Sequence, residues 1–179
     1  MRIEQDTKLD FKDVLFKPKR SKLESRRDVD LIRTYTFHNS KQEWKGVPIM
    51  ASNMDGVGTF EMAKVLQQEK MFTVIGKHHS VDDWKQAIGN GVNMKRISVC
   101  LGTSYIWDKE AADYMTAKTV LQMYPDIKFI CVDVANAYHE NFGDFIAHLR
   151  EEYPDKTIIA GNVVTAEMTE ELIIRGADI

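Results

Sequence analysis

The stretch that decides the fold is residues 129–160, FICVDVANAYHENFGDFIAHLREEYPDKTIIA. Short apolar runs stand at its two ends, Phe129–Val132 and Ile158–Ala160. Between them, four apolar residues follow the i, i+3, i+4, i+7 spacing that lines one face of a helix: Phe142, Phe145, Ile146 and Leu149. The stretch therefore predicts a strand, a helix and a second strand, which is the repeating unit of parallel sheets.

The same alternation extends over most of the chain. From about residue 47 onward, short apolar runs are separated by longer segments of helical period, and a sixth run begins at Ala177–Ile179. The remaining runs are Val47–Ala51, Phe72–Ile75 and Ile97–Leu101. Because the runs are nearly continuously apolar and rich in Val and Ile, we expect parallel strands that are buried on both faces.

Two helix ends are also marked in the sequence. Ser80 is expected to cap the helix that follows it, with Asp83 three positions later completing a weaker form of the capping box. Gly176 stands where a left-handed helix stop is expected, and the sixth run starts directly after it.

Two architectures contain such repeats, an open doubly wound sheet and a closed eight-stranded barrel. The sequence has no G-x-G-x-x-G after the first run and no Walker-type P-loop, which favours the barrel. We therefore predict an α/β fold, in which residues 47–179 form about five βα units and the start of strand 6 of a (β/α)8 TIM barrel. Residues 1–46 are predicted to form an N-terminal arm.

One stretch of the predicted arm, residues 17–33, is rich in positive charge, which Glu24, Asp28 and Asp30 partly offset. The basic residues of this stretch are Lys17, Lys19, Arg20, Lys22, Arg26, Arg27 and Arg33. Such a run is either a solvated surface or a positive patch that meets a phosphate, for which the arginine guanidinium is a suitable donor.

Composition favours a globular protein that acts on small molecules. The 179 residues are 44% hydrophobic and 28% charged, and a net charge of −3 offers no overall attraction to nucleic acid or to an anionic membrane. The charged N-terminus does not resemble a secretory signal and no later stretch is long enough to span a bilayer, so we expect a cytoplasmic protein. Cys100 and Cys131 each lie within an apolar run, which predicts buried strand packing rather than a disulfide, a metal site or a nucleophile.

In a barrel, the reacting groups lie on the loops after the carboxyl ends of the strands. Lys77 and Asp133 are the strongest candidates, because each follows a buried run and is costly to bury without a partner or ligand. Asn53 and Asn162 also follow runs, and they either face a ligand or only bond the turn backbone. No metal site is expected, because the one pair of adjacent histidines points to opposite sides of an extended backbone.

Six short motifs resemble guanosine-monophosphate (GMP) reductases of the inosine-monophosphate (IMP) dehydrogenase/GMP reductase family. They are residues 9–15 (LDFKDVL) with 17–21 (KPKRS), 35–37 (YTF), 52–55 (SNMD), 77–78 (KH), 133–136 (DVAN) and 160–165 (AGNVVT). Their order and spacing agree with the family throughout the 179 residues. IMP dehydrogenase shares the barrel but usually carries a regulatory domain inserted within this region, and no insertion is visible, so the dehydrogenase ranks second.

The resemblance implies a reaction in which a cysteine attacks C2 of the guanine ring of GMP, ammonia leaves, and NADPH delivers hydride to release IMP. By position, the implied cofactor-binding residues are Ser25, Arg26, Lys77, Asp133, Val134 and Ala135. The first two match an arm that contacts the cofactor of a neighbouring subunit, and the last three match the strand end along the nicotinamide. Lys77 and Asp133 are also expected to assist proton transfer. The resemblance further implies a homotetramer.

Five positions depart from the usual family pattern: Ser52, Gly56, Gly76, His79 and Ala137. Ala137 stands where the family has glycine, which can hold a backbone shape that a Cβ disfavours. The nucleophilic cysteine and a site for potassium are expected beyond Ile179, so the isolated chain is expected to be inactive. A half-barrel that binds a nucleotide or a partner subunit without chemistry remains an alternative.

Overall fold

The computed structural model describes residues 7 and 9–179, which fall in two compact units divided between Asp30 and Leu31. The first unit contains two single-turn 3₁₀ helices, η1 (Phe11–Asp13) and η2 (Arg26–Asp28). Each begins with a capping box, in which the side chain before the helix and an aspartate three residues later bond each other's backbone. These local bonds give the first unit its only regular structure among the described residues.

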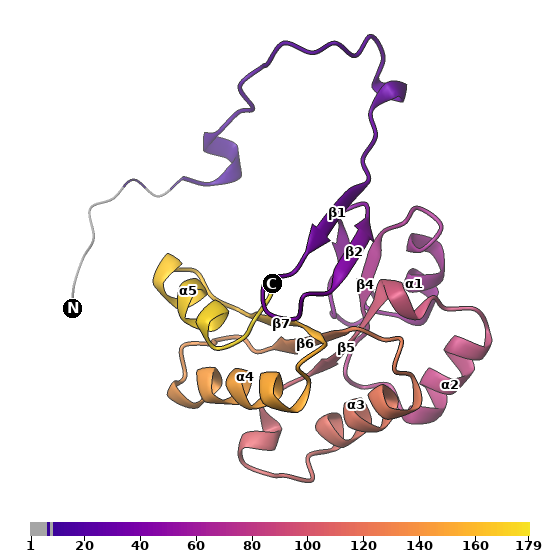
Figure 1. The fold of residues 1–179 in the computed structure, drawn as a ribbon, viewed down its shortest axis with the longest axis vertical. Helices are drawn as coiled ribbons and strands as arrows, with labels where there is room; N and C mark the ends of the chain where they lie inside the picture. The colour runs from indigo at the N-terminus through magenta and orange to yellow at the C-terminus, as the bar shows by residue number, and fades with distance from the viewer. Residues whose placement is uncertain (1–6, 8) are drawn as a thin grey trace. The chain divides into compact units, whose positions relative to one another are not determined.

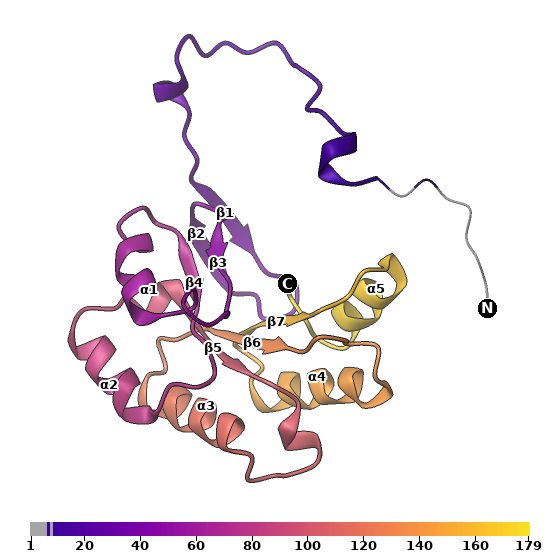
Figure 2. The same ribbon diagram turned by 180° about the vertical axis from the view of Figure 1, so that it is seen from behind.

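The second unit is built on a parallel sheet of five strands that lie side by side in chain order. The strands are β3 (Met50–Ala51), β4 (Phe72–Val74), β5 (Ile97–Leu101), β6 (Phe129–Asp133) and β7 (Thr157–Gly161). The helices are α1 (Phe60–Leu66), α2 (Val81–Gly89), α3 (Ala112–Met123), α4 (Glu140–Glu152) and α5 (Ala166–Ile174), with single turns η3 (Met94–Arg96) and η4 (Ser104–Ile106). Figures 1 and 2 show the helices along the outer side of a curled sheet. The strand order never reverses, unlike that of a doubly wound sheet.

Apolar side chains pack on both faces of the sheet, as the near-continuous apolar runs predict. The helix-facing core includes Ile97, Val99 and Ile130, all of which are almost fully buried. The opposite, concave face carries a smaller cluster: Phe72, Val74, Cys100, Phe129 and Cys131. Both cysteines are therefore buried free thiols within strands, which confirms the predicted packing role.

The first parallel strand is shorter than predicted. Of the predicted run Val47–Ala51, only Met50–Ala51 pairs with β4. Pro48 has no N–H to donate to a ladder, and the N–H of Val47 instead bonds the carbonyl of Lys70 at 2.9 Å. The other four predicted strands agree with β4, β5, β6 and β7 to within one residue at each end.

The predicted sixth run begins to pair with β7. The N–H of Ile179 donates to the carbonyl of Ile158 at 3.1 Å, and the carbonyl of Ile179 accepts the N–H of Ala160 at 2.9 Å. Two such bonds around one residue are the pattern of a parallel ladder. Residue 179 therefore continues the parallel order next to β7.

The predicted helix signals are confirmed. Ser80 caps α2, and Asp83 completes the capping box. Gly176 has a φ of 116°, the left-handed backbone expected after a helix end. The buried face of α4 contains the four residues of the predicted stripe: Phe142, Phe145, Ile146 and Leu149. Within the described part of the chain, no helix is both long and apolar enough to cross a membrane.

An antiparallel hairpin of β1 (Arg33–Thr36) and β2 (Glu43–Gly46) precedes the parallel sheet. Phe37 and Trp44 from this hairpin cover the concave cluster, with Phe37 edge-on to Phe129 at 5.7 Å between ring centres. The predicted arm thus includes an ordered hairpin that belongs to the same compact unit as the sheet. The predicted boundary at residue 46 stays a prediction.

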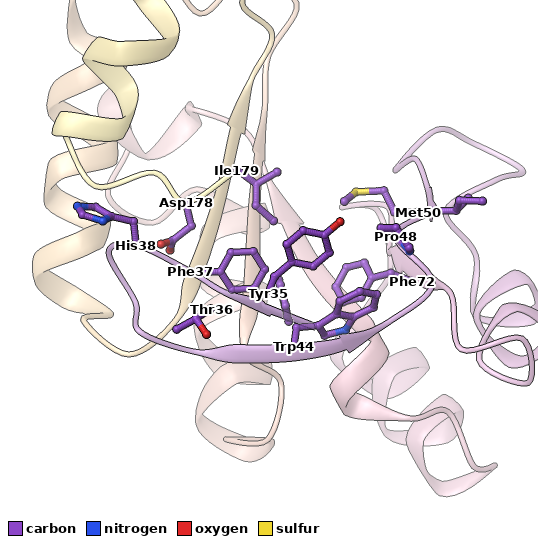
Figure 3. A pocket seen from close by; sticks show the side chains of 12 residues that line it. Tyr35, Thr36, Phe37, His38, Trp44, Pro48, Met50, Phe72, Asp178 and Ile179 are labelled. Carbon is purple, nitrogen blue, oxygen red and sulfur yellow. The ribbon is translucent and has the colours of Figure 1, made fainter. Parts of the chain in front are cut away.

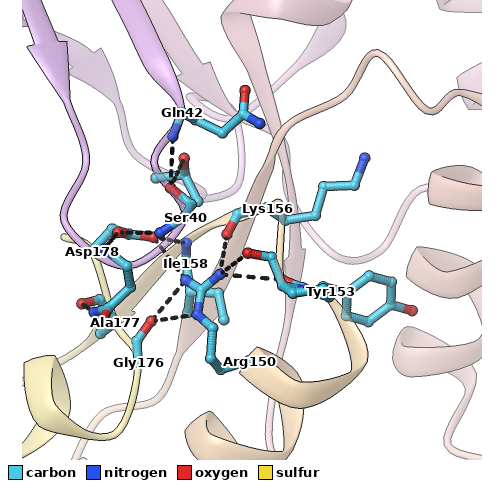
Figure 4. Close-up of polar contacts among 12 residues, drawn as sticks. Ser40, Gln42, Arg150, Tyr153, Lys156, Ile158, Gly176, Ala177 and Asp178 are labelled. Carbon is cyan, nitrogen blue, oxygen red and sulfur yellow. Dashed lines mark hydrogen bonds and ion pairs between the residues drawn. The ribbon is translucent and has the colours of Figure 1, made fainter.

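Asp178 ties the turn of the hairpin to the amino end of the sheet (Figure 4). Its Oδ1 accepts the backbone N–H groups of Asn39 at 2.7 Å and Ser40 at 3.1 Å. Its Oδ2 accepts Nη2 of Arg150 at 2.7 Å and the N–H of Ile158 at 3.2 Å. One fully buried carboxylate therefore joins the hairpin, α4 and β7.

Candidate functional site

Polar side chains from three strand ends meet at the carboxyl edge of the sheet. Asp133 is the last residue of β6, Asn53 follows β3, and Cys100 is the penultimate residue of β5. The Asn53 side-chain nitrogen donates to Asp133 Oδ2 at 2.9 Å and to the Cys100 sulfur at 3.2 Å. The parallel order thus brings together residues that are far apart in the chain, at the edge where barrel enzymes carry their reacting groups.

Lys77 lies on the loop after β4, close to the same group. Its positive charge acts on the Cys100 thiol. A Cβ on Gly102, at the end of β5, would lie 3.4 Å from Lys77 Nζ and 3.3 Å from Asp113 Oδ2. The glycine therefore leaves room for an ammonium and a carboxylate to approach the strand end. A hollow of about 620 Å³ opens beside Lys77, lined by residues of α3 and of the loops after β4 and β5.

The two cysteines face each other across neighbouring strands, since Cys100 of β5 is in register with Cys131 of β6. The hydrogen bond from the Cys131 thiol lowers the pKa of Cys100, and the Asn53 amide acts in the same direction against the effect of burial. The same contact, together with burial, raises the pKa of Cys131. Cys100 is thus the more acidic thiol of the pair.

Backbone hydrogen bonds join the loops after β6 and β7. The N–H of Val134 donates to the carbonyl of Gly161 at 2.9 Å, and the carbonyl of Val134 accepts the N–H of Asn162 at 2.8 Å. Val134 is half-buried against the core, whereas Ala135 beside it is exposed at the strand end. Asp133, Val134 and Ala135 therefore form one continuous edge whose middle residue is fixed on both sides.

Ala137 fits this loop without left-handed backbone. It is fully buried, and its N–H donates to the carbonyl of Asn162 at 3.2 Å. Among the described residues, positive φ outside glycine occurs only at Lys41 and Lys70. The loop thus accommodates the Cβ of Ala137.

Tyr138 adds a side-chain link between the same two loops. Its hydroxyl accepts the N–H of Val164 at 3.0 Å and that of Thr165 at 2.9 Å, and it pairs with the Thr165 hydroxyl at 2.9 Å. These bonds, led by the Thr165 hydroxyl and the Val164 N–H, lower the pKa of Tyr138. The start of α5 is therefore anchored to the loop that follows Asp133.

Ser25 and Arg26, the other predicted cofactor residues, belong to the first unit. Ser25 is the N-cap of η2, and its hydroxyl accepts the N–H of Arg27 at 3.2 Å. Arg26 is exposed. Their predicted contact with a cofactor in a neighbouring subunit stays a prediction.

A second cavity, of about 430 Å³, lies at the opposite end of the strands (Figure 3). Its walls are mainly apolar and include Tyr35 and Trp44 from the hairpin and the first residues of three strands, Met50, Phe72 and Phe129. This cavity lacks the cluster of strand-end polar groups described above. The carboxyl edge is therefore the better candidate site.

The family follows from the sequence as a whole. Residues 8–179 match the model of the IMP dehydrogenase / GMP reductase domain. The chain belongs to the IMP dehydrogenase/GMP reductase family. Within this family, the matched region includes all of β3 to β7 and the residues that follow them.

Several GMP reductases are similar to this chain over its whole length. GMP reductase 1 of Homo sapiens is 52% identical over 179 residues, which cover 99% of this chain and 50% of that protein. The GMP reductases of Ascaris suum and Shigella boydii are also each 52% identical, over 49% and 50% of their own lengths. IMP dehydrogenase of Legionella pneumophila has a TM-score of 0.70 and 24% identity over 94% of this chain and 48% of that one, a likeness that shows the fold alone. The chain spans about half the length of the curated relatives it matches.

Sequence reasoning identified Lys77 and Asp133 but missed two contributors to this edge. Cys100 was expected only to pack, yet its sulfur also accepts a hydrogen bond from Asn53 at the carboxyl edge of the sheet. Tyr138 was not singled out, although it follows the DVAN motif by two positions. A signal for Cys100 was present in its place next to the end of an apolar run, whereas the partners of Tyr138 lie on another loop.

Proposed function

We propose that this chain is the N-terminal half of a GMP reductase, which converts GMP to IMP and ammonia with NADPH as reductant. The observation that carries the proposal is the 52% identity with human GMP reductase 1 along 99% of the chain. The five parallel strands are then the first five of a closed (β/α)8 barrel. In this proposal, activity also requires residues outside this half, among them a nucleophilic cysteine and a potassium site.

The strand-end residues fit NADPH. A dinucleotide needs a cation for its phosphates and close approach to the backbone at its ring. Lys77 supplies a cation, the hollow of about 620 Å³ beside it supplies space, and Gly102 presents no Cβ there. When bound, NADPH supplies the hydride.

Asp133 and Lys77 act on protons and charge next to the reacting atoms. The Asp133 carboxylate accepts a proton or a hydrogen bond, and the Lys77 ammonium stabilises negative charge or donates a proton. Val134 and Ala135 form the surface along the nicotinamide, and the two backbone bonds of Val134 keep that surface rigid. In this proposal the four residues orient the cofactor from two strand ends, with Lys77 after β4 and the other three at the end of β6.

Ser25 and Arg26 extend the site between subunits in this proposal. The Arg26 guanidinium suits a phosphate, and the Ser25 hydroxyl is a further hydrogen-bond donor. Such a contact requires a homo-oligomer, which we propose to be the tetramer of a cytoplasmic enzyme. The side chains of Ser25 and Arg26 are both exposed, which supports this proposed contact.

The direct test is NADPH oxidation on addition of GMP to the full-length protein of the source organism. Turnover that falls by about a hundredfold or more in Asp133→Asn, but not in Asp155→Asn at the amino end of β7, supports the reductase. NAD reduction with IMP in its place would favour the dehydrogenase. The 179-residue chain alone is expected to turn over neither pair, and GMP binding without any turnover by the full-length protein would favour a binding role.

A further inference from the structure

Asn53 makes two hydrogen bonds that neither its own turn nor the cofactor explains. Its Nδ2 donates to Asp133 Oδ2 at 2.9 Å and to Cys100 Sγ at 3.2 Å. A side-chain amide carries two N–H donors, so each hydrogen has one acceptor. Asn53 and Asp133 are 80 residues apart in the chain. The contact therefore exists only because β3 and β6 end at the same edge.

The turn that follows Asn53, residues 54–58, is closed without the Asn53 side chain. The N–H groups of Val57 and Gly58 both donate to the carbonyl of Met54, at 2.9 and 2.8 Å. Within the described chain, the Asn53 side chain forms no hydrogen bond to the backbone of this turn. The Asn53 side chain is therefore not needed to form this turn.

We propose that Asn53 is a positioning residue, which holds the Asp133 carboxylate by Oδ2 and keeps Oδ1 directed at the substrate and cofactor. The inference rests on the proposed function, because it assigns Asp133 a role beside the reacting atoms. Among the described residues, no hydrogen bond ends on Asp133 Oδ1. One oxygen is thus fixed by the protein and the other is available for chemistry.

The surroundings of Asp133 make this donor important. The charge of Asp133 acts on the thiols of Cys100 on β5 and Cys131 on β6, and the charge of Lys77 after β4 acts on the same Cys100 thiol. The neutral amide of Asn53 lies between the carboxylate and the Cys100 sulfur, where it separates two groups that can both carry negative charge. A neutral donor stabilises the ionised carboxylate, whereas a second carboxylate in the same place would oppose it.

Two substitutions separate these effects. Asn53→Leu removes both donors at nearly constant size, and loss of one hydrogen bond to a charged group is expected to lower kcat about tenfold with a smaller change in KM for GMP. Asn53→Asp puts a like charge beside Asp133, which is expected to move the acidic limb of the pH–rate profile about one unit higher. Ser52→Ala, on the same loop and exposed, is the matched control and is expected to change neither quantity.

These rates are measured in the full-length protein, with thermal unfolding as a check that each variant is folded. Unchanged kcat and an unmoved pH profile in both Asn53 variants would overturn the inference if the wild type is active. A second measurement does not depend on turnover: the side-chain amide signals of Asn53 in the NMR spectrum of the 179-residue chain. They are expected to shift as Asp133 titrates and to lose that shift in Asp133→Asn. Asn53 amide signals that are the same in the wild type and in Asp133→Asn at every pH would refute the contact, whatever reaction the protein catalyses.

Discussion

Replacement of Asp178 by alanine is expected to bring the second unit close to unfolding. The carboxylate is fully buried and accepts four hydrogen bonds, one from Arg150, whose side chain is only 16% exposed. Removing one partner of a buried ion pair costs about 3–5 kcal/mol, because the other charge is left without compensation. Three backbone N–H groups lose their acceptor at the same time, although such losses are not additive.

We therefore expect Asp178→Ala to lower the free energy of unfolding by about 4 kcal/mol. That is a large part of the roughly 5–15 kcal/mol typical of a domain. Asp178→Asn keeps the shape and one acceptor oxygen but turns an NH2 group towards Arg150 or towards the hairpin turn. Its cost is expected to be smaller, about 1–3 kcal/mol.

Urea unfolding of the 179-residue chain, followed by tryptophan fluorescence and circular dichroism, measures both values. Asp155→Ala is the control, because Asp155 forms an exposed ion pair with Lys128 at 3.6 Å. Such a pair contributes less than about 1 kcal/mol. If Asp178→Ala were no more destabilising than Asp155→Ala, the argument that this carboxylate fastens the hairpin to the sheet would be wrong.

Two further predictions concern the loops and the acid stability. Tyr138→Phe is expected to speed hydrogen exchange at the amides of Val164 and Thr165 while leaving the unfolding midpoint nearly unchanged. In a spectrophotometric titration, the same substitution is expected to remove one tyrosine that ionises at lower pH than usual. Unchanged exchange at both amides would contradict the hydrogen bonds between Tyr138 and this loop. Burial acts to raise the pKa of Glu152, but hydrogen bonds from Tyr114 and Lys118 lower it overall, so its stabilisation is present above an unfolded pKa of 4.5 and is lost as the pH falls through the lower folded value. Glu152→Gln is expected to flatten this part of the stability profile between neutral and acidic pH, and an unaltered slope would count against it.

Local patterns account for most of the parallel sheet. The predicted run 97–101 agrees with β5 at every residue, and the predicted apolar stripe of α4 is buried. A strand buried on both faces gives a continuous apolar run in the sequence, and a helix buried on one side gives apolar residues at helical spacing. Caps are equally local: the Ser80 and Asp83 box depends on residues three positions apart. The first strand was overestimated because it was predicted from its apolar residues alone, although Pro48 within the run has no N–H for pairing.

The hairpin and the hydrogen bonds of the site could not be predicted in this way. The four residues of β1 are all exposed, so they have no apolar alternation to mark a strand. Their place depends on Asp178, which bonds Asn39 from 139 residues away. Asn53 could equally bond a turn or a ligand from sequence alone, because its acceptors on β5 and β6 come together only once the parallel order forms.

The amino ends of the strands therefore contribute to stability and the carboxyl ends to activity, and substitutions at the two ends should have different effects. At the amino end, Asp178 uses both carboxylate oxygens within the protein, so none of its bonding capacity is left for a ligand. At the carboxyl end, Asp133 has only Oδ2 bonded among the described residues, so its other oxygen can serve chemistry at little cost to folding. Substitutions at Asp178 should change the unfolding midpoint before they change the rate per folded molecule, and substitutions at Asn53 should do the reverse. A protein in which both sets lowered stability and rate in parallel would have no such division.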